Sequence, residues 1–166
     1  MEAIVPKSEA RILLGTSFLS TTSLATAVWL GLYDCAVISA AALFCSVNYW
    51  SHPVYGTRRN LDMAVAAAGV THHVYMSYIY GVYKSYLFFS SLGVAAYLLG
   101  RILEGRKATV AHSCMHVLGN IGNIRLYRSL TDPPPALAEF VLGVMILLTV
   151  IDWPPKWWPV AEYPEM

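Results

Sequence analysis

The residues best suited to chemistry are two histidines, His112 and His116, spaced four positions apart as His-x-x-x-His. On a helix this spacing places both imidazoles on one face, where they can bind the same metal ion. His52 and Asp62 precede them in the chain. Three neutral imidazoles with water in the fourth position form a catalytic zinc site. The metal would lower the pKa of that water, and Asp62 would orient the water or act as general base.

The order of these residues resembles the alkaline ceramidase and progestin/adipoQ receptor superfamily, in which a histidine, an aspartate and a later His-x-x-x-His recur. That family consists of seven-helix membrane proteins that are zinc-dependent lipid amide hydrolases or relatives of them. The resemblance implies that His52, His112 and His116 ligate zinc and that Asp62 holds the water. This chain differs in having Asn48 where the family has serine, and in having fewer helices.

Each of these four residues also has a purely structural interpretation. His112 and His116 can hydrogen-bond to asparagines or to hydroxyl groups of a neighbouring helix. His52 can be a solvated loop residue, and Asp62 can stabilise the start of a helix.

Two further histidines, His72 and His73, lie within an apolar block and are expected to pack or cap inside a bundle. Because histidines on different helices can also ligate haem, His73 and His116 are an alternative pair that the sequence favours less. The segment Gly119-Asn-Ile-Gly122 is expected to be a close helix contact, since no strand precedes it as in a phosphate loop.

Apolar blocks must position all these residues, and a block of about 20 residues can cross a bilayer as a helix. We predict helices in 12–30, 35–50, 61–82, 85–102, 108–126 and 136–151. The last block is short, so it either spans the bilayer or lies at its surface. The first block is not preceded by a leader-like segment, and we expect it to be retained.

The composition fits this pattern, with 57% hydrophobic residues and 13% charged residues, against about 25% charged in soluble domains. We therefore predict an all-α, polytopic transmembrane bundle of five to six helices with short loops, forming a single domain over 1–166. The net charge of +1 argues against nucleic acid as a partner. Three cysteines inside the apolar blocks are expected to be buried free thiols: Cys35, Cys45 and Cys114.

Basic residues predict the orientation, because they gather on the inner side of a membrane. Six spans place most of them on the side of the N-terminus: Lys7, Arg11, Arg58, Arg59, Arg101, Arg106, Lys107 and Lys156. The other side has Lys84, Arg125 and Arg128. The N-terminus is thus expected on the inner side, and a mitochondrial inner membrane is favoured over endoplasmic reticulum or Golgi.

Two functions are consistent with this pattern. The favoured one is an accessory or structural subunit of a larger membrane complex, without independent enzymatic activity, whose partners are other membrane subunits and lipids. Its hydroxyl-rich first block and polar fifth block are expected to face such partners. The alternative is a compact zinc-dependent hydrolase of lipid amides inside the bilayer, using His52, Asp62, His112 and His116.

Overall fold

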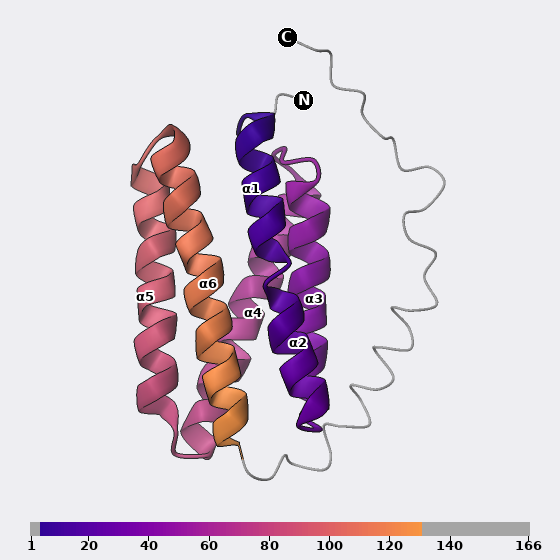
Figure 1. Cartoon of the computed structure of the whole chain (residues 1–166), viewed down its shortest axis with the longest axis vertical. Coiled ribbons are helices and arrows are strands. Elements are labelled where there is room, and N and C mark those ends of the chain that lie inside the picture. Colours follow the sequence, from indigo (N-terminus) through magenta and orange to yellow (C-terminus); the bar gives the residue numbers. More distant parts are fainter. Residues whose placement is uncertain (1–3, 131–166) are drawn as a thin grey trace, which may run out of the picture.

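A computed structural model describes residues 4–130, and every element in that part is a helix. The helices are α1 (Lys7–Ser17), α2 (Ser20–Trp29), α3 (Tyr33–Trp50), α4 (Thr57–Ile79), α5 (Tyr83–Ile102) and α6 (Gly105–Ser129). Since α2 continues the line of α1, the described part is an antiparallel bundle of five rods (Figure 1). A helix lies at each of the first five predicted blocks, which confirms the all-α class. The block 136–151 lies outside the described residues.

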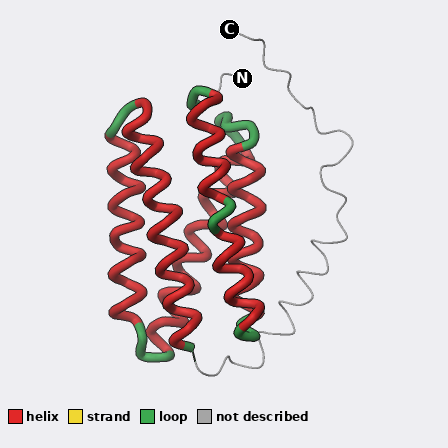
Figure 2. Tube along the Cα trace, in the orientation of Figure 1, coloured by secondary structure: helices red, strands yellow, loops and turns green. Residues whose placement is uncertain are grey.

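The first predicted block, 12–30, is helical but interrupted once, because Phe18 and Leu19 separate α1 from α2 (Figure 2). At the break the amide of Leu19 donates to the carbonyl of Thr16, three residues back, at 3.1 Å. The side-chain hydroxyl of Ser17 donates to the carbonyl of Leu13 at 2.9 Å. Hydroxyls that bond back to the carbonyls of the preceding turn are a known cause of helix bending. The density of Ser and Thr in this block therefore accounts for the break.

The helices α2 and α4 are each followed by a tight turn that contains a glycine, and the two turns have the same backbone form. After α2, Gly31 has φ 70°, and the amide of Leu32 donates to the carbonyl of Ala27 at 2.9 Å. After α4, Gly81 also has φ 70°, and the following residue bonds in the same way to the helix. This is the glycine-terminated helix end in which a left-handed residue satisfies the last carbonyls. Both turns reverse the chain within three residues, so antiparallel neighbours result.

The helices are arranged as a hairpin of α5 and α6 beside a second group formed by α1, α2 and α3, with α4 behind (Figure 1). The start of α1, the α3–α4 loop and the α5–α6 connection share one end of the bundle, called here the upper end. The turns after α2 and α4 lie at the lower end. Within residues 4–130, the start of the chain and the two loops thus share one end of the bundle, as the prediction expects of these three segments.

The inside of the bundle is mainly apolar but also holds polar side chains, and much of its outer surface is apolar. The buried residues include polar ones from five helices: Ser17, Ser23, Asp34, Ser39, His73, Ser77 and Thr109. Large apolar side chains are exposed on the outside, including Trp29 (88%), Tyr78 (74%) and Ile102 (79%). Two helical segments, Lys7–Trp29 and Tyr83–Ile102, are long and apolar enough to cross a membrane.

Candidate functional site

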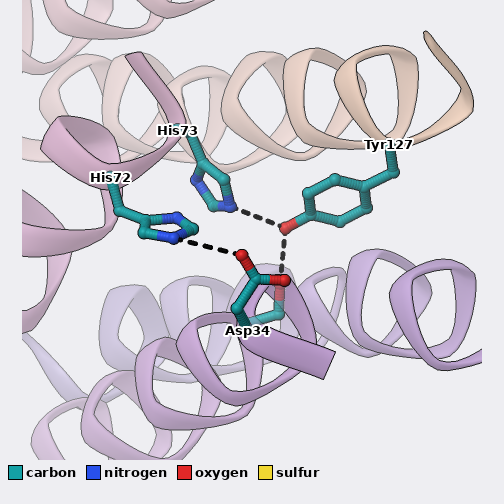
Figure 3. Close-up of polar contacts among 5 residues, drawn as sticks. Asp34, His72, His73 and Tyr127 are labelled. Atoms are coloured by element: carbon teal, nitrogen blue, oxygen red, sulfur yellow. Dashed lines mark hydrogen bonds and ion pairs between the residues drawn. The ribbon is translucent and has the colours of Figure 1, made fainter. Parts of the chain in front are cut away.

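Six polar residues from three helices meet in the lower half of the bundle and are called here the lower cluster: Asp34, Cys35, Ser39, His72, His73 and Tyr127. Figure 3 shows Asp34, His72, His73 and Tyr127 of this cluster. The glycine turn at Gly31 starts α3 at Tyr33, so that Asp34 and Cys35 stand in its first turn. Both are buried, with exposed fractions of 4% and 0%. The positive end of the α3 dipole favours a carboxylate at this position.

Asp34 faces His72 across the α3–α4 contact. Its Oδ2 atom lies 3.3 Å from Nε2 of His72, and the His72 side chain is 19% exposed. The two atoms lack the alignment of a hydrogen bond, and neither has another hydrogen-bond partner in the described part of the chain. Nδ1 of His72 is also buried there without such a partner. Unsatisfied polar atoms at this depth indicate a site that something else completes.

His73 takes part in a second set of contacts, in which its Nε2 atom has a hydrogen-bond partner. The Tyr127 hydroxyl lies 2.9 Å from Nε2 of His73 and 2.9 Å from the hydroxyl of Ser39. Tyr127 comes from α6, His73 from α4 and Ser39 from α3, so one phenol joins three helices (Figure 3). Such a network fixes the orientation of the His73 ring.

The lower cluster can hold a metal ion. One ligand atom from each of Cys35, His72 and His73 lies within 4.8 Å of the other two. Among residues 4–130 this is the one group of three or more histidine, cysteine or acidic side chains gathered so closely. Thiolate and imidazole are the ligands that zinc and copper prefer.

His112 and His116 lie in the upper half of the bundle, where their rings are 5.0 Å apart. Nδ1 of His116 is 2.9 Å from the hydroxyl of Thr16 on α1. The ring of His112 packs edge-on against Trp50, at 5.1 Å between centroids. The structural alternative, a bond from this pair to hydroxyls of the first helix, is thus present for His116.

Asp62 and His52 also belong to the upper half of the bundle, since they lie near the α3–α4 loop, but each contacts other residues than the histidine pair. Asp62 is half-buried on α4 and accepts a hydrogen bond of 2.5 Å from the hydroxyl of Ser46. His52 lies in the α3–α4 loop, where partial burial and the nearby Arg58 lower its pKa, so its imidazole is neutral at pH 7. The structure does not gather His52, His112 and His116 into a close group. Zinc at these residues stays a prediction.

The polar faces of the first and fifth predicted helices bind each other rather than remaining open for partners. Nδ2 of Asn120 donates to the hydroxyl of Thr22 at 2.6 Å, and the hydroxyl of Ser23 bonds to Oδ1 of Asn120. At the upper end the hydroxyl of Thr109 donates to Glu9 at 2.7 Å. At these positions the polar side chains make contacts within this chain, and partners from another chain stay a prediction.

The structure also bears on the candidate haem ligands and on the three cysteines. The candidate haem pair is divided, because His73 bonds to Tyr127 in the lower cluster and His116 to Thr16 in the upper half. All three cysteines are free, as expected, and Cys35 and Cys45 are buried, but Cys114 is exposed on the outside of α6.

Sequence reasoning missed the lower cluster, because it assigned His72 and His73 to packing or capping and gave Asp34 no role. A usable indication was present: Asp34 is an ionisable residue between two apolar blocks, and such residues are usually functional in membrane helices. No family model, no curated protein and no solved structure matches this chain.

Proposed function

We propose that the chain is a polytopic integral membrane protein whose rods all cross the bilayer, and that it works as a subunit of a larger membrane complex. The observation that carries the proposal is the apolar outer surface of the bundle, where many large apolar side chains are exposed, while Asp, His, Ser and Thr side chains are among the buried ones. Water would not favour so much exposed apolar surface. A bilayer favours it, because lipid tails solvate the outside while polar groups bond to each other within.

The connections support a role inside a membrane. Within residues 4–130 the links between helices are short, so this part of the chain builds no domain outside the bundle. The upper end has most of the described basic residues (Figure 1), which favours an upper end on the inner side. An organellar membrane, mitochondrial inner before endoplasmic reticulum or Golgi, belongs to the same proposal.

The surface also favours a subunit over an independent enzyme. A hollow of about 400 Å³ opens between the lower ends of α2 and α6, lined by Ala25, Thr26, Trp29, Leu30 and Arg128. Arg128 is its one ionisable residue, so the hollow offers no acid–base pair for catalysis. Exposed aromatics such as Tyr75 and Phe88 on the outer surface are residue types enriched at protein interfaces.

The test is extraction of the tagged full chain from its native membrane. We expect it to stay in the membrane through an alkaline wash and, in mild detergent, to migrate on a native gel in an assembly far larger than 18.3 kDa. Release by the alkaline wash would refute the membrane proposal. A membrane-bound chain that migrates alone would refute the complex.

A second candidate is the zinc-dependent lipid amide hydrolase, which one contact favours. Trp50 packs on His112, and this brings the end of α3, two residues before His52, against the helix that has His-x-x-x-His. In the hydrolase Asp62 would serve as the water partner. Hydrolysis of a ceramide by the purified chain, lost in His112→Ala, would favour this candidate over the subunit.

A further inference from the structure

The lower cluster has the chemistry of a metal site that is separate from the His-x-x-x-His motif. Three potential ligands converge there, a thiol and two imidazoles, from residues Cys35, His72 and His73. Cys35 and His73 are almost fully buried, at 0% and 2% exposure. His72 is partly exposed, at 19%, so the cluster lies near the surface of the bundle.

We propose that Cys35, His72 and His73 bind one zinc ion, with Asp34 and Tyr127 as the outer partners that orient the two imidazoles. A metal-bound histidine usually donates its second ring nitrogen to a carboxylate, a carbonyl or another oxygen. Asp34 stands at Nε2 of His72 and the Tyr127 hydroxyl at Nε2 of His73. The Nδ1 atoms of both rings then face the ion.

The state of His72 supports this assignment. Its Nδ1 is buried without a hydrogen-bond partner in the described part of the chain, which is costly unless something binds it. An ion at Nδ1 would remove that cost. It would also make Nε2 a proton donor toward Asp34, whose Oδ2 is equally unpartnered at present.

Charge balance favours a divalent ion that accepts mixed ligands. Zinc carries two positive charges, and the Cys35 thiolate and the Asp34 carboxylate carry one negative charge each. The two imidazoles bind as neutral rings, so the occupied cluster is neutral overall and avoids the cost of an unpaired buried charge. The thiol proton of Cys35 leaves for the solvent on binding.

The arrangement leaves a coordination position open. Zinc is usually four-coordinate, and sites with three protein ligands take water or a small molecule in the fourth position. The site would thus differ from a closed structural zinc site of four protein ligands. It lies in the lower half of the bundle, away from the pair formed by His112 and His116 (Figure 1).

Cobalt and zinc titrations of the full chain, purified in detergent and stripped of metal, test the proposal. We expect one equivalent of Co²⁺ to bind with a thiolate-to-metal charge-transfer band, and Zn²⁺ to displace it. Cys35→Ser should abolish the band. Cys45→Ser is the matched control, because Cys45 is also buried on α3, and it should keep the band.

Substitutions of the outer partners should weaken zinc binding less than substitutions of the ligands. Tyr127→Phe should weaken zinc binding by about 10–100-fold, the usual cost of losing an outer partner, while His72→Ala should cost more than that. Circular dichroism and the elution volume show whether each variant is folded.

X-ray absorption at the zinc edge uses the unmodified chain, so it tests whether a thiolate binds zinc even if Cys35→Ser does not fold. We expect one sulfur at about 2.3 Å from the ion. A shell of nitrogen and oxygen alone would overturn the proposal, as would the absence of any bound zinc. Zinc that survives Cys35→Ser and vanishes in His112→Ala would place the metal at the His-x-x-x-His motif instead.

Discussion

Tyr127 and His73 join the end of α6 to the last third of α4, through a contact of 2.9 Å between the phenol oxygen and Nε2. The same phenol lies 2.9 Å from Ser39 on α3. Tyr127 is completely buried, so no water replaces the bond if it is lost. This single hydroxyl therefore couples the register of three helices.

Tyr127→Phe is expected to destabilise the bundle, because it leaves two buried partners without their bond. The loss should be about 1–2 kcal/mol, within the range measured for hydrogen bonds and for unsatisfied buried groups. Unfolding by SDS in mixed micelles, followed by circular dichroism, measures it. Tyr75→Phe is the control, since Tyr75 is 61% exposed on α4, and an equal loss there would contradict the assignment.

Asn120→Ala is expected to loosen the contact between α6 and α2. Asn120 bonds to both Thr22 and Ser23, and hydrogen bonds between membrane helices contribute about 0.6 kcal/mol on average and up to about 1.7. A loss of about 1 kcal/mol in the same SDS titration is the expected outcome. Asn123→Ala, one turn further along α6, should change stability less. If the two variants are equally destabilised, the bonds of Asn120 are not what joins α2 to α6.

The location of each helical rod in residues 4–130 could be predicted from the sequence, because each one corresponds to a long apolar block bounded by polar or turn-forming residues. The boundaries were less accurate. The helix α4 begins at Thr57 rather than 61, since Arg58 and Arg59 look like loop residues although they extend a helix into the polar region. The break at Phe18 was not foreseen, because it arises from hydroxyl bonds to the backbone rather than from Pro or Gly.

The candidate site shows a different limit. His112 and His116 could be paired from their spacing, because four residues on a helix fix their relation. The lower cluster could not be predicted in this way, since Asp34, His73 and Tyr127 come together only through the packing of α3, α4 and α6 (Figure 3). Spacing along the sequence relates residues of the same helix, but it does not show which faces of different helices pack together.

The two glycines of the Gly119–Gly122 segment are expected to respond oppositely to alanine. A Cβ at Gly122 would lie 3.1 Å from Cβ of Phe89 on α5, while a Cβ at Gly119 meets nothing within 4 Å. Gly122→Ala should thus cost about 1–3 kcal/mol through overpacking. Gly119→Ala should be neutral or stabilising by up to about 1 kcal/mol from helix propensity. Thermal unfolding in detergent compares them, and a Gly122→Ala variant as stable as the unmodified chain would mean that α5 and α6 do not approach at Gly122.

The sidedness of the bundle gives a last prediction, which tests whether the rods cross the bilayer. Ser51 and Glu104 are exposed at the upper end and Lys84 is exposed at the lower end (Figure 1). In sealed vesicles, Ser51→Cys and Glu104→Cys should therefore react with a membrane-impermeant maleimide from one side, and Lys84→Cys from the other.

The unmodified chain is the baseline for this labelling. Cys35 and Cys45 are buried in the bundle, and Cys114, although exposed, lies in the middle of α6, where lipid would shield it under the proposed topology. Native thiols should consequently label weakly. Strong labelling of Cys114 would place that face of α6 in water. Reaction of Lys84→Cys from the same side as Ser51→Cys would mean that α4 does not cross, and the polytopic arrangement would have to be abandoned.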